Sequence, residues 1–360
     1  MTRPQRADSD DYEDNFDEEV ETIHYEYKIS SYGADYPVDG LVKRIKRGDI
    51  FIPPFQRKYV WKLPQASRFI ESLLLGLPIP GIFLGRQESS NRLLIIDGQQ
   101  RLLTLQYYYH GVFADTKREF ALTGVQPNLE GLTYIELPDD MRRRLDDAVV
   151  HATIVKQEEP EQDDHSFYLV FERLNTGGTP LSPQEIRSCV SFGPLIKLLA
   201  ELNEDSSWRN MLGKKNVRMR DEELILRTFA LLEGGEYSRP MKTFLNSFAA
   251  RRKDIERDAA DRWRQVFQKT VKHLDAALGS SAFRPKAALN IAVADSVLVA
   301  TASLVLANKE PRSPESLLTA YQQLMSNPEF EAAYSRSTTD DEQVKTRLRI
   351  AKELLAHGFS

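Results

Sequence analysis

The chain has 360 residues, a formal net charge of −5, 41% hydrophobic residues and a single cysteine. This length exceeds what one hydrophobic core usually organises, so two packed regions are expected. The lone Cys189 excludes an intramolecular disulfide and a cysteine-based zinc site, and no apolar run approaches the roughly 20 residues that cross a bilayer. We therefore expect a cytoplasmic protein with no membrane partner.

The first 27 residues differ from the rest in charge. They hold ten acidic residues against two arginines, so this segment carries −8 and the remainder carries +3. A segment with so little apolar surface cannot offset the entropy of ordering, and we expect residues 1–27 to be a disordered acidic tail. Its simplest role is solubility; the alternative is a nucleic-acid mimic that shields a basic groove.

The following residues, 28–180, predict a small domain of mixed helices and strands. Apolar residues at helical spacing and period-two runs distinguish the two kinds of element. Helices are expected at 38–47, 64–75, 99–109 and 166–174, and strands at 50–52, 82–86, 92–96 and 149–155. The strands 82–86 and 92–96 should form a hairpin.

The second half of the chain predicts a different class of domain. Ser182-Pro183-Gln184-Glu185 has the serine cap, first-turn proline and third-position glutamate that start a helix. Helical stretches punctuated by glycine and proline continue from there to the end of the sequence. The expected fold class is α+β, with an all-helical domain over residues 181–360.

Asp97-Gly98-Gln99-Gln100-Arg101 falls at a predicted strand-to-helix junction. A glycine there lets backbone N–H groups approach an anion, and an arginine fork can hold phosphate oxygens. Asp97 could orient a water or a divalent metal, and Gln100 could position the attacking water. The alternative is structural: Asp97 caps the helix, Gln100 completes a capping box, and Arg101 lies on a solvated face.

A second polar pair, Gln56 and Arg57, lies in the irregular aromatic and proline-rich stretch 51–61. A polar pair held in an apolar loop costs free energy unless a partner satisfies it. These two side chains could therefore face the same phosphates as Arg101.

A third segment is the loop that holds Asn175, Gly177, Gly178 and Thr179. Its asparagine and glycines accept positive φ, so the backbone can fold closely around a ligand, and the threonine offers a hydroxyl. The alternative is a helix stop followed by the Ser182 cap.

Four motifs in one order resemble the DUF262 family. They are Pro-x-Phe-Gln-Arg-x-Tyr-Val-Trp ending at Trp61, Leu-Pro-Ile-Pro at 77–80, Asp-Gly-Gln-Gln-Arg at 97–101, and the Phe-Glu-Arg-Leu-Asn-Thr-Gly-Gly-Thr-Pro-Leu-Ser run at 171–182. This family is similar to the N-terminal domain of GmrSD-type restriction enzymes and has the ParB/sulfiredoxin-like fold. The resemblance covers about residues 38–230.

The resemblance implies binding and hydrolysis of a nucleoside triphosphate, with GTP and Mg²⁺ among the expected ligands. By position, the family's site falls on residues 97–101 and on Gln56 and Arg57, with the 175–179 loop near the nucleotide. It also implies a bacterial anti-phage or restriction-type system, with DNA and a separately encoded nuclease or effector as partners. The alternative is a non-enzymatic regulator that binds DNA or a partner under nucleotide control.

Many DUF262 proteins also carry an HNH nuclease domain, and this sequence departs from that pattern. An HNH site needs a histidine general base beside metal ligands. The histidines here are scattered, at positions 24, 110, 151, 165, 273 and 357. We expect no DNA cleavage by this chain alone.

Overall fold

The computed structural model describes residues 12–13, 28–51, 59–87, 91–116, 118–159, 168–170, 173, 181–233 and 235–360. Its contacts divide the chain into two compact units. The sheet unit comprises residues 25–181 and 188–190, and the helical unit comprises residues 1–24, 182–187 and 191–360. Within the described ranges, none of the helices combines the length and apolar character needed to cross a membrane.

The sheet unit is built on a mixed five-stranded sheet in the order β2-β8-β4-β5-β3. β2 is antiparallel to β8, β8 is parallel to β4, β4 is antiparallel to β5, and β5 is parallel to β3. The strands are β2 (Lys28–Pro37), β3 (Ile50–Phe51), β4 (Ile82–Arg86), β5 (Leu93–Asp97) and β8 (Val149–Glu159). A small separate hairpin joins β6 (Val112–Phe113) to β7 (Arg118–Glu119).

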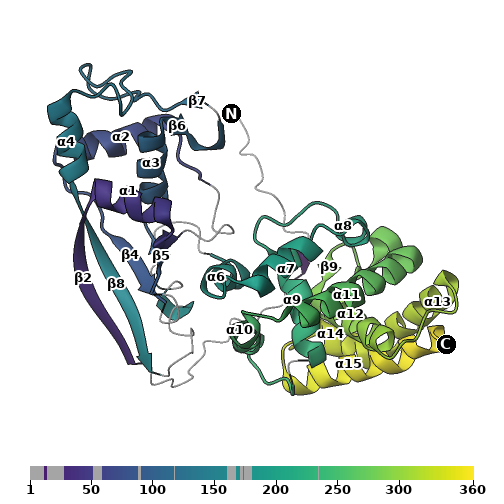
Figure 1. Ribbon diagram of the computed structural model, residues 1–360. Helices are drawn as coiled ribbons and strands as arrows, with labels where there is room; N and C mark the ends of the chain where they lie inside the picture. The colour runs from purple at the N-terminus through teal and green to yellow at the C-terminus, as the bar shows by residue number, and fades with distance from the viewer. Residues whose placement is uncertain are drawn as a thin grey trace. The chain divides into compact units, whose positions relative to one another are not determined.

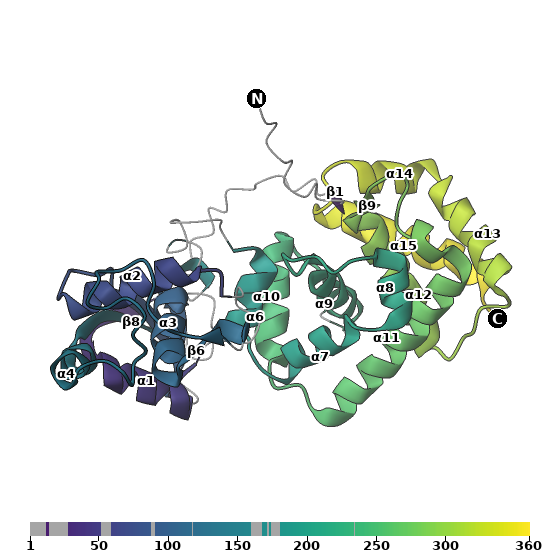
Figure 2. The same cartoon turned by 90° about the horizontal axis from the view of Figure 1, so that it is seen from above.

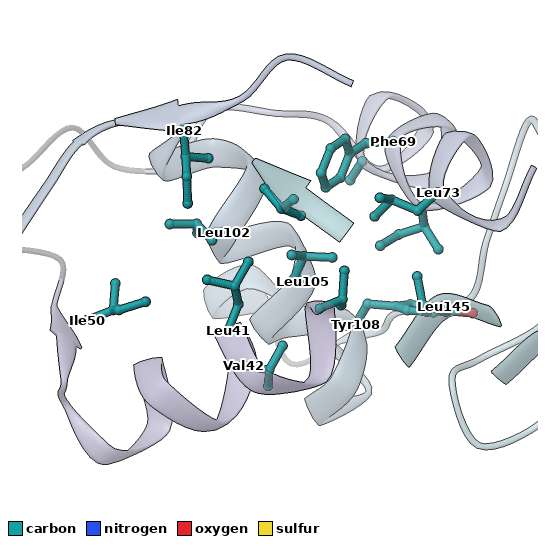
Figure 3. Close-up of a cluster of buried hydrophobic side chains, with 14 of the residues drawn as sticks. Leu41, Val42, Ile50, Phe69, Leu73, Ile82, Leu102, Leu105, Tyr108 and Leu145 are labelled. Carbon is teal, nitrogen blue, oxygen red and sulfur yellow. The ribbon is translucent and has the colours of Figure 1, made fainter. Parts of the chain in front are cut away.

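Four helices lie on one face of this sheet (Figures 1 and 2). They are α1 (Val38–Arg47), α2 (Leu63–Leu74), α3 (Gln99–His110) and α4 (Asp139–Asp147). Figure 3 shows Leu102, Leu105 and Tyr108 of α3 in the same buried cluster as Leu41 and Val42 of α1. Burial of these apolar side chains is what holds α3, and therefore the Asp97–Arg101 segment, against the sheet.

Most expected elements of this unit are present, but β2, α4 and the short strands β6 and β7 were missed. The structure confirms the helix at 38–47, the helix predicted at 99–109, which extends to His110, and the antiparallel pair β4 and β5. The strand β2 was not predicted, because its serines, glycine and aspartate interrupt the period-two alternation and its order comes from pairing with β8. The helix α4 was also missed, since Leu145 is its one buried residue.

The helical unit contains ten helices and one short two-stranded sheet among its described residues. The helices are α6 (Pro183–Val190), α7 (Pro194–Leu202), α8 (Ser206–Leu212), α9 (Arg220–Glu233), α10 (Met241–Arg252), α11 (Arg257–Leu278), α12 (Ile291–Leu306), α13 (Pro314–Met325), α14 (Pro328–Ser335) and α15 (Asp341–Leu355). The last residues of α6 group with the sheet unit. The expected capping box at the start of α6 is confirmed, with the side chain of Ser182 accepting from the amide of Glu185.

The core of the helical unit is α12, which is buried along nearly its whole length. Its one acid, Asp295, is fully buried and accepts hydrogen bonds from Arg227 of α9 and Arg347 of α15, at 2.9 Å and 3.1 Å. A buried carboxylate between two guanidinium groups ties three helices together.

The structure describes two residues of the acidic tail, Tyr12 and Glu13. They form β1 and pair in parallel with β9 (Leu289–Asn290) of the helical unit. The rest of the tail lies outside the described residues, so its predicted disorder stays a prediction. Taken together the fold is α+β, with a mixed sheet in the N-terminal region and a mostly helical C-terminal part.

Candidate functional site

The strand β5 runs into α3 through one residue, Gly98. Its φ of 97° and ψ of 9° place it in the left-handed region. A Cβ at this position would lie 2.4 Å from Cγ2 of Ile82, which is closer than real Cβ atoms come to other atoms. Both the backbone conformation and the space therefore require glycine here. The turn consequently packs directly against the first residue of β4.

Arg101 lies one turn into α3 and is held at the end of the sheet. Its Nη2 donates to Oδ2 of Asp97 at 2.6 Å and to the carbonyl oxygen of Gly81 at 3.0 Å. The arginine side chain is 16% exposed and the aspartate side chain 41% exposed. Among the described residues, the buried Nε of Arg101 has no hydrogen-bond partner. The guanidinium is therefore positioned on one side and unsatisfied at Nε.

The structure contradicts the capping interpretation of this motif. The N-cap of α3 is Gly98, and no side chain caps the helix there. Asp97 is engaged with Arg101 instead. The side-chain oxygen of Gln100 accepts from the backbone amides of Val60 and Trp61, at 2.9 Å and 3.4 Å, rather than closing a capping box. Gln100 and Arg101 of the motif therefore bind other segments of the unit, at residues 60–61 and at Gly81.

A second contact holds the segment of residues 59–61 against α3. The hydroxyls of Tyr59 and Thr104 lie 2.7 Å apart, and that of Thr104 donates to the carbonyl of Gln100. Because the threonine has a single hydroxyl hydrogen, Tyr59 is the donor of the pair. The tyrosine ring also packs edge-on against Tyr107, with 5.1 Å between centroids. Burial raises the pKa of Tyr59 to about 12.

These contacts place the flanks of the loop that holds Gln56 and Arg57. Residues 52–58, and so both side chains, lie outside the described residues. The preceding residue, Phe51, pairs with Leu94 of β5, and the following residue, Tyr59, is fastened to α3. Both ends of the loop therefore sit on the two elements that form the Asp97–Arg101 turn.

The predicted site residues at 175–179 are not located. Asn175, Gly177, Gly178 and Thr179 lie outside the described residues, and their place near a nucleotide stays a prediction. Gln99, the first residue of α3, is described and half-buried. The structure therefore assembles the five motif residues at 97–101 and leaves the other two predicted segments untested.

Sequence reasoning missed three contributors to this site. The carbonyl of Gly81 has no sequence signal beyond its position after the 77–80 motif. Tyr59 lies within the aromatic stretch that was identified, but nothing distinguished its hydroxyl. Thr104 could have been found, because it lies four residues after Gln100 and therefore on the same helix face.

The described residues were compared with what a protein needs to hold a metal ion. No group of three or more His, Cys, Asp or Glu side chains among them is arranged to hold one. Asp97 has the Arg101 guanidinium as its charged partner, and a bound cation would have to compete with it. Mg²⁺ often binds through one or two carboxylates together with substrate phosphates, so Asp97 alone does not define a site. Its role as a metal ligand stays a prediction.

Part of the chain matches a known family. Residues 38–192 match the family model described as GmrSD restriction endonuclease, N-terminal domain. The matched span begins at the first residue of α1 and includes β5, Gly98 and α3; the helices from α7 onward lie outside it. Comparison with curated proteins found no match.

Proposed function

Because residues 38–192 form a domain of the GmrSD N-terminal family, we propose that this chain is the nucleotide-dependent component of a restriction-type defence system. In this proposal it binds a nucleoside triphosphate at the Asp97–Arg101 turn and hydrolyses a phosphoanhydride bond. GTP is the first nucleotide to test. The sheet unit would then be a ParB/sulfiredoxin-like domain, with DNA and a separately encoded nuclease or effector as partners.

The observation that carries the proposal is the state of Arg101. A buried N–H without an acceptor costs roughly 1–3 kcal/mol, and proteins retain such groups where a ligand or another segment satisfies them. The unsatisfied Nε belongs to a side chain at the start of α3 whose Nη2 lies near the left-handed Gly98. Helix N-termini favour anions through their first N–H groups and their dipole. A phosphate oxygen is an acceptor that suits all three features.

The motif residues would divide the work as follows. Arg101, together with Arg57, offsets charge on the phosphates as it builds in the transition state. Asp97 orients the guanidinium of Arg101 and accepts a hydrogen bond from the attacking water. Gln100 acts indirectly, by holding the amides of Val60 and Trp61 and so the end of the loop that carries Gln56.

A binding switch without hydrolysis is the second candidate, and the Asp97 to Arg101 ion pair favours it. One oxygen of the carboxylate is already engaged by the guanidinium at 2.6 Å, so it is less available to accept from a water molecule. Such a protein would change its affinity for DNA or a partner when nucleotide binds, and would release no phosphate.

Phosphate release from GTP, ATP, CTP and UTP by the purified chain separates these candidates. Hydrolysis by the parent, with at least a tenfold loss of nucleotide affinity in Arg101→Ala, supports the first. Arg101→Lys keeps the charge but not the fork, so it should bind nucleotide more weakly than the parent while remaining folded. Arg143→Ala, on the exposed side of α4, is the matched control and should behave as the parent does.

Asp97→Asn tests the catalytic part of the proposal. The amide keeps an oxygen that can accept from Arg101, so stability should fall by no more than about 1 kcal/mol. If the carboxylate acts in the transition state, kcat should fall by roughly 10²-fold or more. Parental turnover in a folded Asp97→Asn protein would remove Asp97 from the mechanism. If the parent binds nucleotide without turnover, the binding switch is the function that remains.

A further inference from the structure

An aspartate and a histidine meet on adjacent strands of the sheet unit, outside every motif described above. Nδ1 of His151, on β8, lies 2.8 Å from Oδ1 of Asp35, on β2. The neighbours of His151 along β8, Val150 and Ala152, point into the helix-covered core. Side chains alternate between the two faces of a sheet, so the imidazole lies on the opposite face. Its side chain is 61% exposed, and water reaches the ring.

Gly33 makes room for this imidazole, and Gly81 makes room for the backbone carbonyl of His151. A Cβ at Gly33 would lie 3.0 Å from Cε1 of the ring, and a Cβ at Gly81 would lie 2.9 Å from the carbonyl oxygen of His151 and 3.6 Å from Cδ2. Neither glycine has a φ in the left-handed region, so backbone conformation does not require them. The space that they leave is taken by His151.

Stability does not explain this arrangement. A glycine inside a strand such as Gly33 weakens the strand, because it adds unfolded-state freedom and offers no side chain for packing. An ion pair whose two side chains are 61% and 68% exposed contributes little to the free energy of folding, since water screens it. The fold therefore gains little stability from this pair, and stability gives no reason for placing an aspartate and a histidine here.

The pair lies next to the Asp97–Arg101 turn through Gly81. The carbonyl of Gly81 accepts from Nη2 of Arg101 at 3.0 Å, and the same residue abuts His151. Gly81 is therefore shared by the two groups, although Arg101 belongs to α3 on the helix-covered face and the imidazole lies on the opposite face. A nucleoside triphosphate would have to bind across this end of the sheet to reach both.

The geometry also sets the direction of proton transfer. An imidazole that donates from Nδ1 to a carboxylate carries its acceptor lone pair on Nε2, and the carboxylate holds the ring in place. This is the arrangement of a general base with its orienting acid. Asp35 is the charged group that the structure places against the ring.

We infer that His151 is a general base for the hydrolysis proposed above, with Asp35 as its positioning residue; the inference rests on that proposed function. The oxygen of a water molecule bonds to the γ-phosphorus while its proton passes to Nε2 of His151. The bond between the γ-phosphorus and its bridging oxygen breaks, and the electron pair leaves on the nucleoside diphosphate. The proton then returns to solvent from the exposed imidazolium.

Three variants of the full chain test the inference. His151→Gln should lower kcat by about 10²- to 10⁴-fold, the usual contribution of a general base, while nucleotide affinity stays within about twofold of the parent. It should also abolish the acid limb of the pH–rate profile, which a purely structural role would leave in place. Asp35→Asn should give a smaller loss of kcat. His110→Gln, an exposed histidine at the far end of α3, is the matched control and should turn over nucleotide at the parental rate.

Labelling by diethyl pyrocarbonate, read residue by residue by mass spectrometry, gives an independent measurement. Bound GTP, or whichever nucleotide the parent binds, should shield His151 and leave His110 reactive. Parental turnover in His151→Gln, or full labelling of His151 with nucleotide bound, overturns the inference and leaves the proposed function standing. A parent that binds nucleotide but releases no phosphate ends the hydrolysis proposal, and the base role of His151 with it.

Discussion

Replacing Gly98 with alanine is the sharpest test of the turn between β5 and α3. At a φ of 97°, any residue with a Cβ is strained by about 1–2 kcal/mol. The new methyl group would also lie 2.4 Å from Cγ2 of Ile82, and overpacking of this kind costs about 1–3 kcal/mol. The two effects together predict a loss of about 2–5 kcal/mol in the free energy of unfolding of the sheet unit.

The other end of the same helix supplies the control. Gly111 has a φ of 74°, and a Cβ there would have nothing within 4 Å. Gly111→Ala should therefore show the conformational strain alone, about 1–2 kcal/mol. The excess loss in Gly98→Ala measures the contact with Ile82. In an Ile82→Ala background this excess should shrink, because the nearest atom is gone.

Hydrogen exchange measured by mass spectrometry suits this comparison, because it reports the two units separately. Peptides from α3 should exchange faster in Gly98→Ala than in Gly111→Ala, while peptides from α12 stay unchanged. Nucleotide affinity should fall in Gly98→Ala alone. If the two alanine variants are equally stable, the close packing of the turn against Ile82 does not exist as described.

Three further predictions concern other contacts. Gln100→Ala removes the acceptor for the amide of Val60, so residues 59–61 should exchange faster in hydrogen exchange, with a cost of about 1 kcal/mol, while α3 persists. Burial raises the pKa of Tyr59 to about 12, so the unfolded chain loses this proton before the folded protein does as the pH rises above 10. The free energy of unfolding should therefore fall between pH 10 and 12. Alkaline denaturation of Tyr59→Phe should lack that part of the fall. Asp295→Asn leaves buried guanidinium groups without their counter-charge and should cost about 3–5 kcal/mol, seen as faster exchange in α12 with the sheet unit unaffected.

Much of the local structure could be predicted from the sequence, because local signals determine it. The apolar spacing of residues 38–47 and the glycine that follows specify α1 and its end, where Gly48 adopts a φ of 79°. The serine, proline and glutamate at 182–185 specify the start of α6. The family of the 38–192 region was also recognisable from four short motifs in order.

The role of each motif residue depended on the tertiary structure. The spacing of Asp97 and Gln100 suits a capping box as well as it suits a binding site. Only the left-handed Gly98 decides between them, because it takes the N-cap position and frees the aspartate for Arg101. That conformation in turn reflects the packing of the turn against β4, which is not encoded in the spacing of the motif.

The sequence by itself determined which segments become helices and strands where a strong local pattern exists. It also determined the existence of the Asp97–Arg101 turn and the match of residues 38–192 to the GmrSD N-terminal family model. The tertiary structure decided what lies beside that turn. β2 owes its order to a ladder with β8, and this ladder brings together Asp35 and His151, which are 116 residues apart. Such long-range strand pairing depends on residues far apart in the sequence, so the periodicity of a single segment does not predict it.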